Sequence, residues 1–565
     1  MPGTWQALTH QPTFNTSTMI LLSDGRIMVQ EEATNHWHAL TPDSYGSYVD
    51  GSWSPLADMS FWRRYYASGM LKDGRIVLIG GEQSGAGGDT NKGEIYDPVS
   101  DSWSSMPSPP GWAQVGDAAC CILPSGDLMI GALTTPRCAI FDPVTDCWSP
   151  AASKAIRPNE ETWVLLPDDT IVSPQCFPPY RSERYSISSN AWKDEGALPV
   201  SVVDHVMSEI GPAMLMYNGK VIYFGAADVG GNGKTAIYTP PAIYTGTGTW
   251  AEGPDIPNIG GKTIVCNDCP ASLLPNGKVL AACAPFVVNN WGSPIYFIEY
   301  DPFGNTLIEA PTPPNNAKQL YWSRLMLLPT GQVLFSPSSS DVQCYTPDGD
   351  PQDAWRPVIT SVSRHGTPSA TDYYLLTGLQ LNGLSQGNMY GDDCNPATNY
   401  PLVRLHNPKT HQVFFARTYH FSTRAVSAPN APQSVRFTAA HAPHGHYELW
   451  VVANGISSHC FHFCHQHPQK PCGCWQEGEC HCHKVCNADA CCEEVSMVGP
   501  EIIELRGQIK RLDNSVRRLE SFIKIEEPPS EPKEVTKKAK EEEEPEKQEE
   551  SERRRAERTK DRKSK

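Results

Sequence analysis

The chain has 565 residues, 39% of them hydrophobic, so it is long enough for several modules with buried cores. Its net charge of -17 excludes nucleic acid as the main partner, because phosphate binding needs a basic surface. The 44 glycines and 50 prolines, together with 15 tryptophans and 21 tyrosines, indicate many short strands joined by tight turns.

The first residues, MPGTWQALTHQPTFN, contain neither the basic nor the apolar part of a signal peptide. No stretch of about 18 consecutive apolar residues occurs, so neither a membrane-spanning helix nor membrane insertion is expected. We therefore expect a cytoplasmic protein whose cysteines are mostly reduced thiols, or a secreted one if an upstream signal was removed.

A repeat of about 50 residues occurs seven times in the first two thirds of the chain. Each copy has an apolar pair, a polar turn and a second apolar run, as in LLSDGRIMV and LLPNGKVLAACA, and the turns are 43 to 58 residues apart. An Asp-Gly or Asn-Gly pair between apolar runs predicts a hairpin, because such turns need positive φ. The turns are centred on Gly25, Gly74, Gly126, Asp169, Gly219, Gly277 and Gly331.

A second element follows most of these hairpins: an aromatic residue, a turn and a tryptophan. It reads YDPVSDSW, FDPVTDCW and YSISSNAW, ending at Trp103, Trp148 and Trp192. This pattern predicts another hairpin whose tryptophan packs between neighbouring sheets. Four strands in a repeat of this length are typical of a kelch propeller, so residues 1–355 are predicted to form a seven-bladed β-propeller. No helical periodicity occurs here, which excludes helical repeats.

The pattern changes at residue 356. Short alternating strands such as YYLLTGLQL, QSVRFTAAH and HYELWVVANG follow one another up to residue 458. Six or seven strands in about 100 residues predict an immunoglobulin-like β-sandwich over 356–458. The protein is therefore predicted to be all-β up to this point.

Residues 459–495 form a segment rich in cysteine and histidine, the two residue types that bind Zn²⁺ or Cu(I) with sulfur and nitrogen. The segment has too few apolar residues to fold by burial, so a bound metal would supply its folding free energy. The alternative is a disulfide-linked or disordered spacer. The expected metal ligands are Cys460, Cys464, Cys472, Cys474, Cys480, Cys482, Cys486, Cys491, Cys492, His462, His465, His481 and His483.

An apolar heptad repeat occupies residues 500–525, with β-branched residues and leucine in alternation. This choice favours a parallel two-stranded coiled coil and hence a homodimer; the alternative is an amphipathic helix that packs on its own propeller. Residues 526–565 are blocks of charge with proline and are expected to be disordered. The heptad positions are Ile502, Leu505, Ile509, Leu512, Val516, Leu519 and Ile523.

The stretch RRYYASGMLKDGRIVLIGGEQSGAGGDTNKGEIYDPVSDSW, the stretch LYWSRLMLLPTGQVLF and the ending HYELWVVANGISS resemble galactose oxidase and related copper-radical oxidases over roughly residues 1–458. In that family a copper ion on the propeller axis is held by two tyrosines and two histidines. One tyrosine is linked to a cysteine, carries a radical, and lies beneath a tryptophan. The C-terminal domain of that family is an early-set sandwich.

The resemblance carries the radical tyrosine onto Tyr65, the axial tyrosine onto Tyr321 and the last histidine onto His420. It also predicts that three site residues have been replaced. The cysteine falls on Asn15, the tryptophan on Gln83 and the other histidine on Trp322. Two phenolates and one imidazole are a weak ligand set for Cu(II), so copper on the axis is not expected.

Other histidines offer possible substitutes. His36 and His38 alternate along a predicted strand and so share one face, where packing on the surface is the simpler interpretation. His441, His444 and His446 fall in a loop before the last sandwich strand, as solvated turn residues or a weak metal site.

Three functions fit the sequence. The leading hypothesis is a non-catalytic binding or scaffold protein that engages a protein or carbohydrate ligand on a propeller face and is oligomerised by its coiled coil. The first alternative is a copper-dependent oxidoreductase that acts on a carbohydrate or small primary alcohol through a rearranged site. The second is a metal-handling protein that acts through its Cys/His segment.

Overall fold

The computed structural model describes residues 2–82, 88–226, 231–243, 245–365, 373–387, 397–427 and 431–465, and the backbone of the short strands β40 (Trp475–Gln476) and β41 (Glu479–Cys480). The chain divides into two units, Met1–Cys472 and Gly473–Lys565. Gln83, the predicted coiled coil at 500–525, the charged tail and most of the Cys/His segment lie outside the described residues, so the predictions made for them stay predictions.

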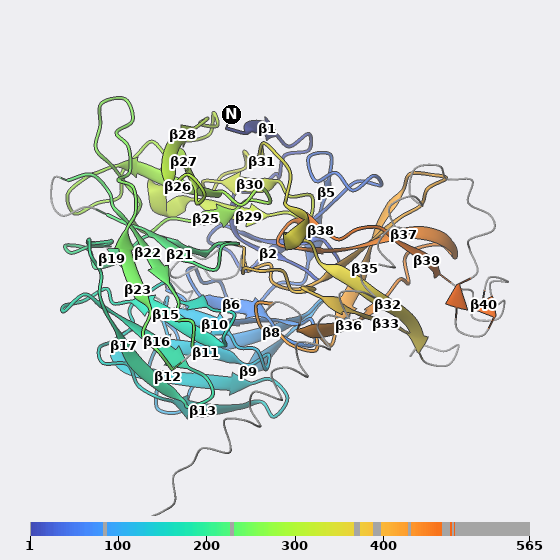
Figure 1. The fold of residues 1–565 in the computed structure, drawn as a ribbon, viewed down its shortest axis with the longest axis horizontal. Coiled ribbons are helices and arrows are strands. Elements are labelled where there is room, and N and C mark those ends of the chain that lie inside the picture. The colour runs from blue at the N-terminus through green and yellow to red at the C-terminus, as the bar shows by residue number, and fades with distance from the viewer. Residues whose placement is uncertain are drawn as a thin grey trace, which may run out of the picture. The chain divides into compact units, whose positions relative to one another are not determined.

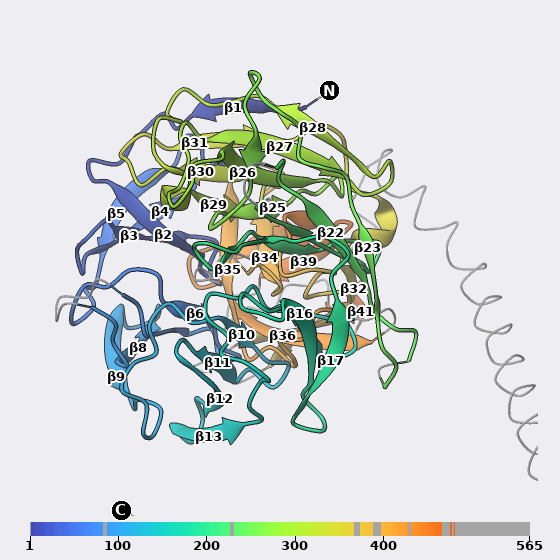
Figure 2. The same cartoon turned by 90° about the vertical axis from the view of Figure 1, so that its left-hand side faces the viewer.

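Seven antiparallel sheets follow one another along residues 4–346 and surround a common centre (Figure 1, Figure 2). Blades one to three are built from β2 (Thr16–Leu21), β3 (Ile27–Glu31), β4 (Trp37–Thr41) and β5 (Ser52–Leu56); β6 (Ala67–Met70), β7 (Ile76–Ile79), β8 (Gly93–Asp97) and β9 (Ser102–Met106); and β10 (Cys120–Ile122), β11 (Leu128–Ala132), β12 (Thr135–Asp142) and β13 (Cys147–Ala151).

Blades four to six are built from β14 (Val164–Leu165), β15 (Thr170–Pro174), β16 (Arg181–Ser186) and β17 (Ala191–Ala197); β20 (Ala213–Leu215), β21 (Val221–Phe224), β22 (Thr235–Thr239) and β23 (Thr249–Glu252); and β24 (Ile264–Val265), β25 (Ala271–Leu273), β26 (Val279–Pro285), β27 (Tyr296–Asp301) and β28 (Thr306–Ala310). A small hairpin of β18 (Val203–Asp204) and β19 (Glu209–Ile210) joins blades four and five.

Blade seven closes the ring with a strand from the other end of the chain. Its strands β29 (Arg324–Leu327), β30 (Val333–Ser336) and β31 (Gln343–Thr346) follow the short helix η1 (Leu320–Trp322), and the N-terminal strand β1 (Thr4–Ala7) pairs with β31 as the fourth. The indole of Trp5 lies 4.9 Å from the ring of Tyr345 and donates to the Pro311 carbonyl of blade six at 2.6 Å. The ring is thus held shut by packing and hydrogen bonds between the two ends.

The repeated sequence elements form the structures predicted for them. The glycines of the inner turns have positive φ, from 77° at Gly219 to 97° at Gly126. The tryptophans of the outermost strands join neighbouring blades, because each donates its indole N–H to the blade before it: Trp103 to the Ala57 carbonyl at 2.8 Å and Trp148 to the Pro107 carbonyl at 2.7 Å. The predicted seven-bladed kelch propeller is confirmed.

The C-terminal part is a second all-β layer. After η2 (Asp353–Trp355), its strands are β32 (Val358–His365), β33 (Tyr373–Leu379), β34 (Leu402–His406), β35 (Val413–Tyr419), β36 (Pro432–Thr438), β37 (Gly445–Ala453), β38 (Ile456–Ser457) and β39 (Phe461–His465). β35 pairs with β34 through one half and with β36 through the other, so it passes between two sheet halves whose apolar faces share a core. The immunoglobulin-like class of this sandwich stays a prediction.

The last strand corrects a predicted boundary. β39 pairs with β37 in register from Gly445 with His465 to Leu449 with Phe461. The sandwich therefore continues through His465 and does not end at residue 458, because Phe463 is buried against Tyr374 and Phe437. The first residues of the Cys/His segment are part of a sheet.

The sandwich contacts the inner turns of the propeller. Thr418 donates its backbone N–H to the Ser23 carbonyl at 3.1 Å, and Phe421 donates to the Lys72 carbonyl at 3.0 Å. Leu273, on the innermost strand of blade six, donates to the Gly387 carbonyl at 2.7 Å. Segments of the sandwich thereby cover the end of the propeller at which the innermost strands finish. Within the described part of the chain, no helix is long and apolar enough to span a membrane.

Candidate functional site

The innermost strands begin at the end of the propeller away from the sandwich, and we call this end the channel mouth. The seven repeats can be aligned on their inner turns. In each blade the residue before the turn donates its backbone N–H to the carbonyl of the residue four positions later, so residues at the same distance before this bond are equivalent. The mouth positions are therefore homologous from blade to blade. They are Thr16, Tyr65, Asp117, Glu160, Ile210, Asp268 and Trp322.

Aromatic rings and guanidinium groups occupy the side of the mouth formed by blades seven and two. Tyr65 is buried, with 5% of its surface exposed and a left-handed φ of 52°. The guanidinium of Arg324 lies 5.2 Å from its ring centre. Arg64 lies 5.1 Å from the ring of Trp322 and forms an ion pair with Glu32. Two cationic groups therefore lie over Tyr65 and Trp322, two positions to which the resemblance assigns copper-site residues.

Tyr321 is half-buried on the same side. Its ring centre lies 4.6 Å from that of Trp291 and 4.9 Å from that of Trp322. Burial raises the pKa of its phenol, and the positive charge of Arg64 opposes that shift. A phenol with a raised pKa is a poorer anionic ligand at neutral pH. The structure thus brings both tyrosines to the mouth without activating Tyr321 for metal binding.

The structure does not bring His420 to the tyrosines. His420 lies beside Tyr419, next to the backbone contact between Phe421 and Lys72 at the sandwich end of β6. Tyr65 precedes β6 at the other end, so the length of that strand, about 13 Å, lies between the two ends. The assignment of His420 as a remnant copper ligand stays a prediction, and this placement does not support it, because a single histidine in a matching string carries no information about its depth in the fold.

Of the two other replaced positions, only one can be placed. Asn15 is exposed and has an amide where the family has a thiol, and Gln83 lies outside the described residues. Copper does not fit the described residues: one imidazole is remote, an indole replaces the other, and guanidinium groups lie over the aromatic rings. We derive no chemistry through copper.

The substitute histidines near the N-terminus are surface residues. His36 is 2.9 Å from Asp58, and that exposed carboxylate raises the pKa of the imidazole. His38 is 3.2 Å from Glu31 and stacks on Phe14 at 3.7 Å. Both contacts lie on or beside the third strand of blade one, away from the innermost strands.

Carboxyl groups occupy the opposite side of the mouth, and the sequence analysis missed them. Glu160, Glu209 and Asp268, here called the carboxylate cluster, offer oxygens that all lie within 4.8 Å of one another. Asp117, from blade three, is 7% exposed and interacts electrostatically with Asp268 and Glu209. The signal was present in the repeat: three of the seven mouth positions are acidic.

Two of these carboxyl groups, those of Asp117 and Glu209, have raised pKa values. Burial is the largest cause that raises the pKa of Asp117 to about 7, followed by the negative charge of Glu82. Burial and the charge of Asp268 also raise the pKa of Glu209 well above its ordinary value, although a hydrogen bond with Glu160 opposes the shift. Each pKa is raised because the ionised carboxylate is poorly solvated and lies near other negative charges.

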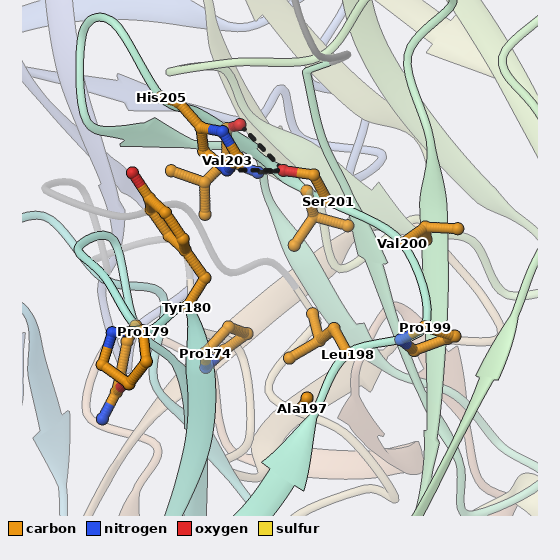
Figure 3. Close-up of a pocket in the computed structure, with 12 residues that line it drawn as sticks. Pro174, Pro179, Tyr180, Ala197, Leu198, Pro199, Val200, Ser201, Val203 and His205 are labelled. Carbon is orange, nitrogen blue, oxygen red and sulfur yellow. Dashed lines mark hydrogen bonds between the residues drawn. The ribbon is translucent and has the colours of Figure 1, made fainter.

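A cavity of about 250 Å³ opens at the segments that join β15 to β16 and β17 to β18 (Figure 3). Its wall combines proline and aliphatic residues with the ring of Tyr180, which stacks on His205 at 4.0 Å. His205 contacts the Ser201 hydroxyl at 3.0 Å and lies in the loop between β18 and β19. Because β19 also holds Glu209, one hairpin connects the cavity to the carboxylate cluster.

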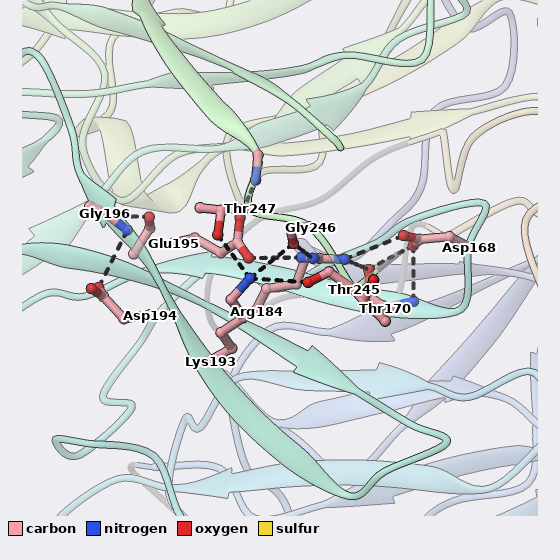
Figure 4. A network of polar contacts seen from close by, with 12 residues as sticks. Asp168, Thr170, Arg184, Lys193, Asp194, Glu195, Gly196, Thr245, Gly246 and Thr247 are labelled. Atoms are coloured by element: carbon pink, nitrogen blue, oxygen red, sulfur yellow. Dashed lines mark hydrogen bonds and ion pairs between the residues drawn. The ribbon is translucent and has the colours of Figure 1, made fainter. Parts of the chain in front are cut away.

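A polar network on blade four is structural (Figure 4). Arg184 is buried and donates to Glu195 at 3.0 Å and to the Gly246 carbonyl of blade five at 2.5 Å. Glu195 also accepts from the Tyr238 hydroxyl at 2.9 Å. Every member of this network has a partner, so it ties two blades together and leaves no group for a ligand.

The described part of the Cys/His segment lies beside the sandwich histidines. The rings of His444 and His465 stack at 4.6 Å, and His446 is the register partner of Cys464 across β37 and β39. Cys464 is buried, whereas Cys460 is exposed. The structure thus brings His444, before β37, and His446, on β37 itself, together with predicted ligands of the segment. The remaining predicted ligands lie outside the described residues, apart from His462 on β39 and the backbone of Cys480 on β41.

The comparisons agree with this architecture. The Kelch motif family matches residues 63–110, which cover blade two. Two galactose oxidases from Gibberella zeae are each 44% identical over 64 residues, or 11% of this chain and 9% of theirs. An F-box/kelch-repeat protein from Arabidopsis thaliana is 28% identical over 131 residues, or 20% of this chain and 27% of its own. The chain thus matches only about a tenth of the galactose oxidases' length.

Among solved structures, a fungal alcohol oxidase of the AA5 family in complex with copper superposes with a TM-score of 0.50. The match covers 82% of this chain and 99% of the oxidase chain. Because the sequences are only 14% identical, the match shows a shared fold and nothing about function. Fold and motif define the class as a kelch-type β-propeller protein. Within that class, the chain has a propeller fold similar to that of galactose oxidase and the copper alcohol oxidase.

Proposed function

We propose that this chain is a non-catalytic galactose oxidase-like propeller that binds a protein or carbohydrate ligand at the channel mouth. The observation that supports this most is the placement of Arg64 over Trp322 and of Arg324 over Tyr65. A guanidinium group is permanently charged and cannot coordinate a metal, so it opposes a second cation nearby. Oxidase chemistry at this position would need the copper ion that these groups disfavour.

The mouth is the binding face in this proposal because the other end of the propeller is covered by the sandwich. The cavity lined by Tyr180 and His205 offers an aromatic platform with polar groups beside it. Such platforms suit the flat faces of sugar rings and the side chains of protein loops. The coiled coil predicted at residues 500–525 would make this binding multivalent.

The test for catalysis is a titration of the purified chain with Cu(II), followed by absorbance spectroscopy and a peroxide assay with a panel of primary alcohols and sugars. We expect no tyrosyl-radical band and no peroxide. The Tyr65→Phe variant is the matched control, because it removes the only candidate radical residue. A radical band or peroxide in the parent chain that is lost in Tyr65→Phe would overturn the proposal in favour of an oxidase.

The test for binding uses the Tyr180→Ala variant on glycan and peptide arrays. We expect ligands of the parent chain to be lost, because the ring that forms the cavity wall is gone. Tyr45→Ala, which alters an exposed tyrosine on blade one, is the control. Ligands retained by Tyr180→Ala would place the binding surface elsewhere.

A second candidate function is metal handling through the Cys/His segment. The stacking of His444 on His465 and the pairing of His446 with Cys464 favour it, since sandwich residues lie beside the predicted zinc or Cu(I) ligands. Elemental analysis should compare the full chain with a chain ending at His465, which keeps β39 intact. Zinc or copper in the full chain only would support this function, and equal metal content would contradict it.

A further inference from the structure

We propose that His446, Glu448, His462 and Cys464 bind one zinc ion on the outer face of the sandwich strands β37 and β39. The proposal deepens the metal-handling candidate and rests on it for two of the ligands, His462 and Cys464. It adds His446 and Glu448, which lie outside the Cys/His segment. The site is thus completed by the sandwich itself and needs no further residue of that segment.

The strand register places the four residues at the corners of one rectangle. His446 pairs with Cys464 across β37 and β39. Glu448, two residues further along β37, pairs with His462. Tyr447, between the two on β37, is 2% exposed and belongs to the sandwich core. Because alternate residues of a strand point to opposite faces, the four side chains leave the sheet on the face away from that core.

The rectangle has the size of a zinc site. Neighbouring strands are about 4.8 Å apart, and alternate residues of one strand are about 6.8 Å apart, so each α-carbon lies about 4 Å from the axis through the centre. An ion on that axis, above the sheet, is at a similar distance from all four side chains. Zinc binds sulfur, nitrogen and oxygen at about 2.0–2.3 Å. The exposed imidazoles of His446 and His462 have to turn toward the axis, which rotation about their side-chain bonds allows without a change of the backbone.

A separate contact orients the carboxylate. His406, on the neighbouring strand β34, is the register partner of Glu448, and its Nδ1 atom lies 2.7 Å from Glu448 Oε2. Carboxylates that bind a metal are hydrogen-bonded in this way, which fixes their position. The side chain of Glu448 is still 28% exposed, so the carboxylate remains accessible to an ion. His406 is therefore a positioning residue of the proposed site.

The guanidinium of Arg404 lies beside the rectangle and not over it. Arg404 is the register partner of Trp450 and stacks on its indole at 4.8 Å. Trp450 follows Glu448 by two residues, whereas His446 precedes it by two. The positive charge therefore lies on the far side of Glu448 from His446 and Cys464. This distinguishes the sandwich face from the channel mouth, where guanidinium groups lie directly over the residues assigned to copper.

The donor set favours zinc over other ions. One thiolate, two imidazoles and one carboxylate match the preference of Zn²⁺ for four ligands of sulfur, nitrogen and oxygen. Carboxylates are poor ligands for Cu(I), and calcium and magnesium bind oxygen ligands. The thiol of Cys464 would lose its proton to the solvent on binding, and at 8% exposure its bond to zinc would be shielded from water. Bound zinc would thereby fasten β39 to β37.

The experiment measures zinc binding by the full chain, which is stripped with EDTA, reloaded with zinc chloride and titrated with a competing chelator. The His446→Ala and Glu448→Gln variants should each bind one zinc ion fewer, or bind it at least about tenfold more weakly, because each removes a ligand. Neither residue belongs to the Cys/His segment, so this loss is specific to the sandwich site. His441→Ala, at an exposed histidine before β37, is the matched control and should bind as the parent does.

Alkylation of Cys464 provides a second readout that a purely structural role of His446 would not change. Iodoacetamide labelling and peptide mass spectrometry should show that zinc protects Cys464 in the parent chain, and that His446→Ala loses this protection. A chain ending at His465 keeps all four ligands and should retain this one ion. Unchanged zinc binding in both ligand variants would overturn the proposal and leave the metal-handling candidate intact, whereas a parent chain that binds no zinc would overturn both.

Discussion

Replacing Arg184 with methionine tests how the blades are held together. The guanidinium is 3% exposed and is bonded to Glu195, Asp168 and the Gly246 carbonyl at 3.0, 3.3 and 2.5 Å. Methionine has a similar length but no charge. It would leave the carboxylate of Glu195, itself 2% exposed, with neutral donors from Tyr238 and Gly248 only.

Breaking a buried ion pair by removing one partner costs about 3–5 kcal/mol, because a buried charge is left without its counterion. We therefore expect Arg184→Met to lower the free energy of unfolding by an amount in that range. Urea unfolding followed by tryptophan fluorescence measures it, since Trp250 lies on blade five and Trp192 on blade four.

Two further variants separate the buried pair from charge in general. Arg181 and Asp194 form an exposed pair on the same two strands, so Arg181→Met should unfold with the parent chain. Adding Glu195→Gln to Arg184→Met should recover part of the loss, because a neutral amide is less costly to bury than a carboxylate. Equal destabilisation by Arg181→Met, or no recovery in the double variant, would refute the reasoning.

Three further predictions concern other parts of the chain. Trp5→Ala should lower the free energy of unfolding by about 3 kcal/mol, because the indole packs against Phe297, Phe335 and Tyr345 and closes the ring; unchanged urea unfolding would mean that β1 is dispensable. A chain ending at Ser458 should have a lower thermal midpoint than one ending at His465, since it lacks the buried Phe463; equal midpoints by calorimetry would contradict the role of β39. Leu512→Asp should convert a dimer into a monomer by light scattering, and a persistent dimer would assign association to another surface.

The predictable parts of the fold are those that depend on residues close together in the sequence. The Asp-Gly and Asn-Gly turns dictate positive φ, and the tryptophans at fixed distances from them reach the preceding blade, as Trp103 does. The closure of blade seven was not predicted, because β1 and β31 are paired across nearly the whole propeller sequence. The seventh repeat lacks its own strand with a tryptophan. TWQA at the N-terminus supplies that strand, and this was the clue in the sequence.

The candidate site was harder to predict for the same reason. The resemblance assigned Tyr65, Tyr321 and His420 to one site; the two tyrosines lie together at the mouth, whereas His420 lies near the other end of β6. The carboxylate cluster is distributed over separate connecting segments of three blades, with Asp117 on a fourth, so no short motif contains it. Aligning the repeats on their inner turns would have found Glu160, Asp268 and Asp117 but not Glu209, which lies one residue before the aligned position.

The channel mouth is best understood as two halves with opposite charge. Arg64 and Arg324 cover the aromatic rings on one side, while Asp117 and the carboxylate cluster lie on the other, and the pKa of Tyr321 is affected by charges from both. A cation would be repelled from the first half and attracted to the second. The positive groups lie over two residues to which the resemblance assigns the copper site, and this placement opposes the binding of a further cation beside the tyrosines.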